Sequence, residues 1–386
     1  MCSNNSEVVK LTQELVKIPS ENPVGTEETI SDFIFNWFKE LNLDVTREEV
    51  EPGRYNIVAK LLGNDKEPNL LYIAHMDTVS AGEGWTYGPF SAKIVNGKLY
   101  GRGSADMKGG VAAAMVAFKR IALRKEKPKR SFIFIASVDE EGIEMKGALA
   151  AIDRGWAKKS SYVIATEPTR LAVMLAHKGV LWYEIISHGK ASHAGNPQLG
   201  VDANHAMAEI LSALKKIVNE LPYNDNLVGK PTVSIGKISG GVKTNIVSSE
   251  CRAEIDLRIV VPMTIAKSKQ IIEKAVNEGI KNVPGASATF RLFNNERPPI
   301  KAAEDSPLVA AVAESVKKVT NKDPEFKGLP GYTDASIIGA RTGCPHCISF
   351  GPANMAQAHS IDEYAPIEQL NLAADILTET ALKLIY

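Results

Sequence analysis

Apolar residues in the first part of the chain form short runs that alternate with helical patterns. Apolar positions recur at helical spacing over 7–18, and the Ala-rich segment 111–123 has the same character. Continuous apolar runs predict buried strands at 70–74, 131–136 and 162–165, with a weaker one at 347–350. Strands that alternate with helices in this way are typical of an α/β fold with a mostly parallel sheet.

The middle of the chain follows a different pattern. It predicts strand, helix, strand, strand, helix and strand in turn, over 180–187, 203–221, 232–238, 245–260, 264–277 and 286–293. This β-α-β-β-α-β order is the ferredoxin-like arrangement. Two more helices are predicted, over 307–319 and from Pro366 onward. We therefore expect an α/β domain made of 1–178 and 294–386, with a smaller α+β domain, 179–293, inserted into it.

Composition excludes several classes of protein. The 386 residues include 45 Lys+Arg and 45 Asp+Glu, so net charge gives no reason to expect binding to nucleic acid or a membrane surface. No run of about 18 apolar residues predicts a transmembrane helix. The polar residues 1–5 do not resemble a secretory leader. Four cysteines are too few for a disulfide scaffold, and we expect a reduced, cytoplasmic protein.

Polar residues that can do chemistry follow each predicted strand of the first domain. His75 and Asp77 follow the first strand, the segment 139–142 follows the second, Glu167 follows the third, and a loop leads from the fourth to His359. In open α/β sheets, ligand sites form where the carboxyl ends of the strands meet. These imidazole and carboxylate groups are therefore predicted to converge.

The glycine-rich segment 101–110 carries Asp106 just before a predicted helix. From there Asp106 could reach the same place as the strand-end residues. A glycine loop before a helix can also bind phosphate. However, the segment has neither the P-loop pattern nor the dinucleotide-binding glycine pattern, and nucleotide binding is not favoured.

Two imidazoles and several carboxylates suit a divalent transition ion such as zinc. Five ligands exceed what one four-coordinate ion needs, and they suit two ions that share a carboxylate and activate a water. One more carboxylate must then accept the proton of that water. The adjacent pair Glu140 and Glu141 could divide these roles, because neighbouring side chains at a strand end point in different directions. Each group alone could be structural or solvated; their joint pattern favours a metal centre.

Three motifs, 75–79, 101–110 and 139–142, closely resemble one metallopeptidase family. That family contains acetylornithine deacetylase, succinyl-diaminopimelate desuccinylase, aminoacylase and glutamate carboxypeptidase. The resemblance extends over essentially the whole chain. The metal ligands that it implies are His75 and Glu167 for one ion, Glu141 and His359 for the other, and Asp106 as the bridge between them.

The resemblance also implies roles around these ligands. Asp77 would accept a hydrogen bond from the far ring nitrogen of His75. Glu140 would be the general base, taking a proton from the water and giving it to the leaving amine. The peptide bond between Asp106 and Met107 would be cis. Zinc is the first choice for the two ions, with cobalt and manganese as alternatives.

The inserted domain carries further matches to the family. The segment 189–197 resembles its lid motif, which implies that His193 reaches across a dimer interface to polarise the scissile carbonyl; His188 is the alternative. Arg258, assisted by Asn245, would bind the α-carboxylate of the substrate. The alternative for Arg258 is a salt bridge on the sheet surface. The segment 331–335 corresponds to a substrate-pocket loop.

Two cysteines, Cys344 and Cys347, could suggest a structural zinc site. No second pair of ligands follows at suitable spacing, and Cys347 begins a predicted buried strand. Free buried thiols are therefore the favoured interpretation.

Taken with the resemblance, these residues predict a two-domain amidohydrolase with two metal ions, in which the lid mediates homodimer formation. Its first candidate substrates are N-acyl amino acids, of the kind cleaved by acetylornithine deacetylase or succinyl-diaminopimelate desuccinylase. The alternative within the family is a carboxypeptidase or dipeptidase that acts on short peptides. A non-enzymatic relative is disfavoured, because all the implied ligands and the base are present.

Overall fold

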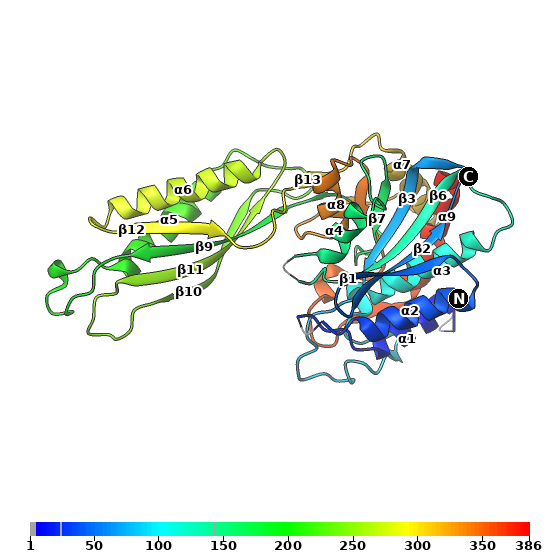
Figure 1. Ribbon diagram of the computed structural model, residues 1–386, viewed down its shortest axis with the longest axis horizontal. Coiled ribbons are helices and arrows are strands. Elements are labelled where there is room, and N and C mark those ends of the chain that lie inside the picture. Colours follow the sequence, from blue (N-terminus) through cyan, green and yellow to red (C-terminus); the bar gives the residue numbers. More distant parts are fainter. Residues whose placement is uncertain (1–4, 24, 143) are drawn as a thin grey trace. The chain divides into compact units, whose positions relative to one another are not determined.

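The computed structural model describes residues 5–23, 25–142 and 144–386 and divides into two compact units (Figure 1). Unit 1 consists of Met1–Ala176, Lys301–Gly328 and Thr333–Tyr386. Unit 2 consists of His177–Ile300 and Leu329–Tyr332. The range 179–293, which we expected to form an inserted domain, lies inside unit 2. The first four residues, on which we partly based the expectation of no leader, lie outside the described residues.

In the described part of unit 1, a nine-stranded sheet runs in the order β1-β2-β6-β3-β7-β15-β8-β13, and β14 also pairs with β8. The four neighbouring strands β6, β3, β7 and β15 are parallel, β1 and β2 are antiparallel to their neighbours, and β8 is antiparallel to β15. This confirms the mostly parallel α/β sheet. The strands are β1 (Val45–Glu51), β2 (Arg54–Leu61), β3 (Asp65–His75), β6 (Arg130–Ser137), β7 (Tyr162–Ala165), β8 (Val173–His177), β13 (Ile300–Lys301), β14 (Phe326–Leu329) and β15 (Cys347–Ser349).

Helices pack on this sheet in two groups. The helices α1 (Glu7–Lys17), α3 (Gly109–Ala122) and α9 (Ile367–Ile385) pack against one another, and α3 and α9 also contact β3 and β6. In the second group, α4 (Lys146–Asp153) packs against α8 (Asp334–Thr342), which contacts β3, β7 and β15 (Figure 1). Two further helices in the described part of unit 1 are α2 (Glu28–Glu40), which contacts β1 and β2, and α7 (Pro307–Thr320), which packs on α9.

Apolar strands and helices form the core of unit 1. Phe38, Phe118, Phe132 and Phe134 are fully buried and stack edge-on or tilted against one another between α2, α3 and the sheet. Such contacts bury large apolar area at favourable ring geometry. A small three-stranded sheet, with strands β16 (Tyr364–Pro366), β5 (Lys98–Tyr100) and β4 (Lys93–Val95), lies outside this core.

Unit 2 has the predicted β-α-β-β-α-β order. Its four-stranded antiparallel sheet runs in the order β10-β11-β9-β12. The elements are β9 (Gly179–His188), α5 (Ala203–Asn219), β10 (Thr232–Gly240), β11 (Glu250–Ile259), α6 (Ile265–Lys281) and β12 (Ser287–Leu292). The strand predicted at 245–260 begins five residues later than expected. The side chains of Asp202 and Thr264 cap α5 and α6 by accepting backbone N–H groups.

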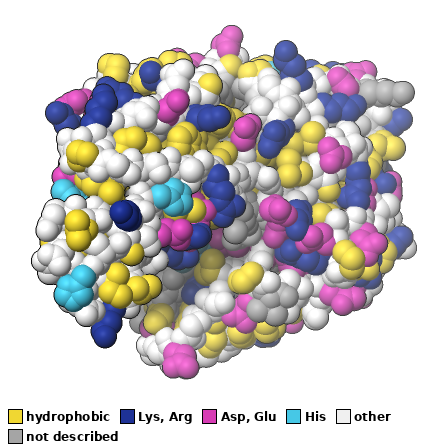
Figure 2. Space-filling model, turned by 60° about the vertical axis from the view of Figure 1, so that its left-hand side comes forward, with side chains coloured by type: hydrophobic (Ala, Val, Ile, Leu, Met, Phe, Trp, Pro, Cys, Tyr) yellow, Lys and Arg dark blue, Asp and Glu magenta, His cyan; other side chains and the backbone are white. Residues whose placement is uncertain are grey.

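Basic and acidic side chains are interspersed over the face shown in Figure 2, without a large patch of one sign. This agrees with the equal numbers of acidic and basic residues. None of the helices in the described ranges is both long and apolar enough to span a membrane.

Candidate metal centre

His75 ends strand β3 and is almost completely buried. Its Nδ1 lies 2.9 Å from the backbone oxygen of Asp77, and its Nε2 lies 3.2 Å from Oδ1 of Asp106. A carbonyl oxygen can only accept, so Nδ1 carries the hydrogen and Nε2 is left as the ligand atom. The resemblance implied Asp77 as this acceptor without specifying the atom. Oδ1 of Asp77 lies farther from Nδ1, at 3.6 Å, so the backbone oxygen of the same residue is the nearer partner.

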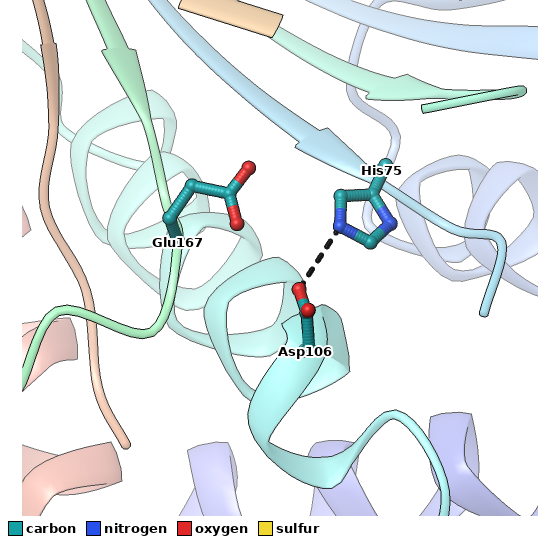
Figure 3. A group of neighbouring side chains, drawn as sticks. All are labelled: His75, Asp106 and Glu167. Carbon is teal, nitrogen blue, oxygen red and sulfur yellow. Dashed lines mark hydrogen bonds and ion pairs between the residues drawn. The ribbon is translucent and has the colours of Figure 1, made fainter. Parts of the chain in front are cut away.

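Asp106 lies in the turn η1 (Ser104–Lys108), which leads from the glycine-rich loop into α3. The peptide bond between Asp106 and Met107 is cis, as the resemblance predicted. A Cβ atom on Gly110 would lie 1.9 Å from the backbone oxygen of Thr166. Only glycine therefore lets the start of α3 approach the end of β7 so closely. In Figure 3, Asp106 and His75 point toward each other and Glu167 stands beside them at the end of β7.

The structure brings the five predicted ligands into two groups that share one carboxylate. His75, Asp106 and Glu167 form one group, and Asp106, Glu141 and His359 form the other. Within each group the potential ligand atoms lie within 4.8 Å of one another. Two ligand atoms on one tetrahedral zinc ion are about 3.3 Å apart. The Nε2 atom of His359 lies 3.1 Å from Oε1 of Glu141 and 3.6 Å from Oδ2 of Asp106, which is close to that spacing.

The chemistry of these residues fits divalent cations. Burial, with Asp106 and other acids nearby, raises the pKa of Glu167 well above its usual value although His75 opposes the shift. Its Oε1 is buried and has no hydrogen-bond donor among the residues that the structure describes. Buried carboxylates without donors are costly unless they are paired or bind a metal. The imidazole nitrogen and carboxylate oxygen atoms of these residues are ligand atoms that zinc, cobalt and manganese bind.

Glu140 and Glu141 occupy different positions although they are adjacent. Glu141 pairs with His359, whereas Oε2 of Glu140 lies 3.9 Å from Nε2 of His75 and belongs to neither ligand group. Burial is the largest cause of the raised pKa of Glu140, and the neighbouring Glu167 adds to it. Glu140 is therefore a carboxylate with a side chain only 10% exposed, which lies next to the potential ligands but outside both ligand groups.

A buried ion pair that sequence analysis missed connects the segments that carry Asp106 and His359. Oε1 of Glu363 accepts the backbone N–H groups of Ala105 and Asp106, at 2.8 and 3.0 Å. Its Oε2 accepts a hydrogen bond of 2.6 Å from Arg102, which also donates to the backbone oxygen of Ser360. Glu363 lies four residues after His359, so the pair holds both segments. Its only sequence signal is this proximity to two predicted ligands.

Asp334 is a second acidic residue to which the sequence assigned no individual role. It begins α8, and its Oδ2 accepts a hydrogen bond of 2.5 Å from the hydroxyl of Ser137 at the end of β6. Burial raises the pKa of Asp334 to about 6. The segment 331–335 was predicted as a substrate-pocket loop. Its residues are divided between the two units, with Gly331 and Tyr332 in unit 2.

The predicted substrate-binding residues lie in unit 2. Nδ1 of His193 accepts a 3.0 Å hydrogen bond from the backbone of Gly195, so its hydrogen is on Nε2 and can be donated outward. The alternative, His188, lies 3.5 Å from the hydroxyl of Thr289. Arg258 forms two hydrogen bonds to Asp256, at 2.6 and 2.7 Å. The salt bridge that we considered as its alternative is thus present.

Asn245 and the two neighbouring cysteines complete the comparison with the sequence predictions. Asn245 is exposed, and its backbone oxygen accepts the N–H of Ala194. Cys344 and Cys347 are free and buried, as favoured from sequence. Within the described ranges, neither cysteine belongs to a group of potential metal ligands.

The mixed α/β fold and the two groups of potential metal ligands are what a metal-dependent hydrolase would need. The sequence pattern of peptidase family M20/M25/M40 matches residues 71–383, and the chain belongs to this family. It is 28% identical to a probable succinyl-diaminopimelate desuccinylase from Staphylococcus aureus, over 98% of both chains. It is 29% identical to an acetylornithine deacetylase from Vibrio cholerae, over 93% of this chain and 92% of the relative. The crystal structure of aminopeptidase PepT from Bacillus cereus superposes with a TM-score of 0.79 at 23% identity, covering 98% of both chains.

Proposed function

We propose that the protein is a cytoplasmic, dinuclear metal-dependent amidohydrolase that cleaves N-acyl amino acids. The observation that carries this proposal is the pair of donor groups that share Asp106, with Glu140 left over beside His75. Two relatives that the chain resembles over nearly its whole length, a probable desuccinylase and a deacetylase, favour an acyl amino acid as substrate. A carboxypeptidase or dipeptidase of the same family is the alternative.

In this proposal each ion would have three protein ligands, and one ligand would be common to both. His75, Asp106 and Glu167 would hold one ion, and Asp106, Glu141 and His359 the other. When bound, the ions would make a water more acidic and polarise the scissile carbonyl group. The hydrogen bond from Nδ1 of His75 to a backbone oxygen supports this assignment, because it leaves Nε2 free to bind metal.

Glu140 would move the proton. Its carboxylate would accept a proton from the attacking water and deliver it to the nitrogen of the leaving amine as the amide bond breaks. Its burial and its acidic neighbours raise the pKa of Glu140, so its carboxylate holds a proton more strongly than an exposed glutamate does. One carboxylate would thus serve as base and then as acid.

Unit 2 would bind two groups of the substrate, the carbonyl of the scissile amide bond and the α-carboxylate. Nε2–H of His193 of the partner subunit would donate a hydrogen bond to the carbonyl oxygen on which negative charge develops. Arg258 and Asn245 would hold the α-carboxylate, because a guanidinium can form two parallel hydrogen bonds with it. Arg258 now makes this contact with Asp256, so the substrate carboxylate would have to replace or share that partner.

A homodimer formed through unit 2 is part of the proposal. Strand β10 is at one edge of the four-stranded sheet, so one row of its backbone groups faces no other strand of that sheet. Ile235 and Ile238 on β10, and Val242 and Ile246 after it, are exposed, Val242 to 87%. An exposed edge strand with apolar side chains favours pairing with another chain. A second copy would cover these side chains, and the His193 of each subunit would then act at the metal centre of the other.

Charged substitutions on this edge should therefore separate the dimer. We expect the double variant Ile238→Lys, Val242→Asp to sediment as a monomer at concentrations where the wild type is a dimer, and to lose most activity. Leu62→Asp is the matched control, because Leu62 is 59% exposed but lies in unit 1. A wild type that sediments as a monomer would contradict this part of the proposal.

A substrate panel separates the proposed function from its alternative. We expect zinc-loaded protein to release free amine from N-acetylornithine, N-succinyl-diaminopimelate or simple N-acyl amino acids with higher kcat/KM than it cleaves dipeptides. Amine release from every substrate would be compared under identical metal loading. Cleavage of peptides alone would replace the deacylase with the peptidase alternative. Two bound ions without turnover of any substrate would mean that the substrate class is wrong.

A further inference from the structure

The turn that carries Glu140 and Glu141 is held by a carboxylate from a different strand end. Oδ1 of Asp77 accepts the backbone N–H of Glu140 at 3.2 Å, and Oδ2 accepts that of Glu141 at 3.1 Å. Asp77 is fully buried. The position of this carboxylate therefore determines where both glutamate side chains begin.

Asn22 connects this carboxylate to a second one. Its Nδ2 donates to Oδ2 of Asp77 at 2.8 Å and to Oδ1 of Asp139 at 3.2 Å. All three residues are buried. An amide nitrogen carries two hydrogens, so a single neutral side chain can satisfy both acids at once. Asn22 thus fixes the distance between Asp77, which holds the turn, and Asp139, which begins it.

Asp139 begins the turn in an unusual backbone conformation. Its φ of 67° lies in the left-handed region, which residues other than glycine seldom adopt. Its Oδ1 also accepts a hydrogen bond from Arg54 at 3.2 Å, and its Oδ2 accepts the backbone N–H of Lys146 at 3.2 Å. The Arg54 guanidinium is in turn paired with the buried Glu27. The side chain of Asp139 is therefore fixed from several sides.

The end of the turn passes directly over these contacts. A Cβ atom on Gly142 would lie 2.3 Å from Oδ1 of Asp139 and 3.2 Å from Nδ2 of Asn22. The first distance is too short for any real side chain. Gly142 is therefore required because the backbone packs on the Asn22–Asp139 contact.

We propose that Asn22 is a positioning residue for the Glu140–Glu141 turn, acting through Asp77 and Asp139. Without its amide, two buried carboxylates each lose a donor, and the turn loses the link between its two supports. Displacement of Glu140 lowers kcat, and displacement of Glu141 weakens one metal site. These two consequences rest on the proposed function, whereas the loosening of the turn does not.

The first test uses metal-free protein and compares Asn22→Ala with Asn69→Ala. Asn69 is an equally buried asparagine of unit 1 that donates to the backbone oxygen of Trp156 and accepts from Ser161, away from the turn. Hydrogen exchange measured by mass spectrometry on peptides covering 138–146 should be at least about fivefold faster in Asn22→Ala, as expected if at least one of the two lost hydrogen bonds holds the turn closed. Asn69→Ala should exchange there like the wild type.

The second test measures zinc binding by calorimetry and steady-state kinetics in the same variants. Asn22→Ala should bind one of the two ions about 10- to 100-fold more weakly, as for other residues that orient metal ligands. Its kcat should fall while KM changes less than about twofold, because the loss affects the reacting groups more than substrate binding.

Three outcomes decide the matter. Unchanged exchange and zinc affinity in a folded Asn22→Ala protein would overturn the proposal, even if its unfolding midpoint falls as far as that of Asn69→Ala. Suppose that Asn22→Ala exchanges faster but the wild type hydrolyses none of the substrates. This outcome would support the positioning role and reject the proposed function. If Asn22→Ala does not fold, Gly142→Ala disturbs the same contact from the other side. It should show the same faster exchange, and exchange like that of the wild type would overturn the proposal.

Discussion

Replacing Glu140 with alanine is expected to lower kcat by about 10²- to 10⁴-fold while two metal ions stay bound. Glu140 is outside both ligand groups, so its loss removes proton transfer and leaves the ligands in place. Glu140→Gln should behave in the same way, because it keeps the shape of the side chain but removes the basic oxygen. The measurement is steady-state kinetics on zinc-loaded protein, together with its metal content.

Glu144→Ala is the control for this experiment, since Glu144 follows the same turn but its side chain is 54% exposed. It should keep kcat within about twofold, as expected for an exposed side chain away from the reacting atoms. A Glu140→Ala protein with wild-type kcat would remove Glu140 from the mechanism. A variant that lost its metal as well would show that Glu140 acts as a ligand and not as the base.

Loss of Asp106 is expected to affect both metal sites, unlike loss of Glu140, because both groups of potential ligands include this carboxylate. Asp106→Ala should bind fewer than two ions and show no measurable hydrolysis. Treating the wild type with a chelator should abolish activity, and added zinc, cobalt or manganese should restore it. Asp323→Ala, at a side chain 84% exposed, should retain both ions and full activity.

Thermal unfolding gives a readout of metal binding that does not depend on turnover. A ligand at 1,000 times its Kd stabilises the folded state by about 4 kcal/mol, so zinc should raise the Tm of the wild type by several degrees. Asp106→Ala should lose most of this rise. A full zinc-dependent rise in the variant would mean that the ions bind elsewhere in the protein.

The sequence predicted the four parallel strands of the core and the convergence of the potential ligands for one physical reason, but it did not predict β2, β8 and α2, which also carry buried apolar residues. Buried parallel strands are continuous apolar runs, and their carboxyl ends meet at one edge of the sheet. Strand β1 was not predicted, because Val45–Glu51 has four charged side chains and only its first residue is buried. Such an edge strand carries little of the apolar signal that marks β3, β6 and β7.

The supporting contacts of the centre could not be predicted in this way. Asn22 and Asp77 are 55 positions apart, and Arg102 and Glu363 are 261 apart, so no local periodicity connects them. The motif also could not predict which atom of Asp77 makes each contact. His75 uses the backbone oxygen of Asp77 while the carboxylate holds the next turn. Sequence motifs identify the residues of a site, but only three-dimensional contacts assign the atoms.

The neighbouring positions of β8 and β13 bear on how the chain can carry so long an insertion. The chain leaves unit 1 after Ala176 and returns at Lys301, and the backbone N–H of Ala302 donates to the oxygen of Leu175 at 2.7 Å. The two ends of the insertion are thus about one strand spacing apart.

Pairing β15 with β7 closes a loop of roughly 180 residues. With unit 2 folded, its residues no longer lengthen that loop, which lowers the entropic cost of closure by about 1 kcal/mol. The adjacent exit and return points therefore let unit 1 host the insertion His177–Ile300 at little conformational cost, and they mark where that segment could be exchanged for another.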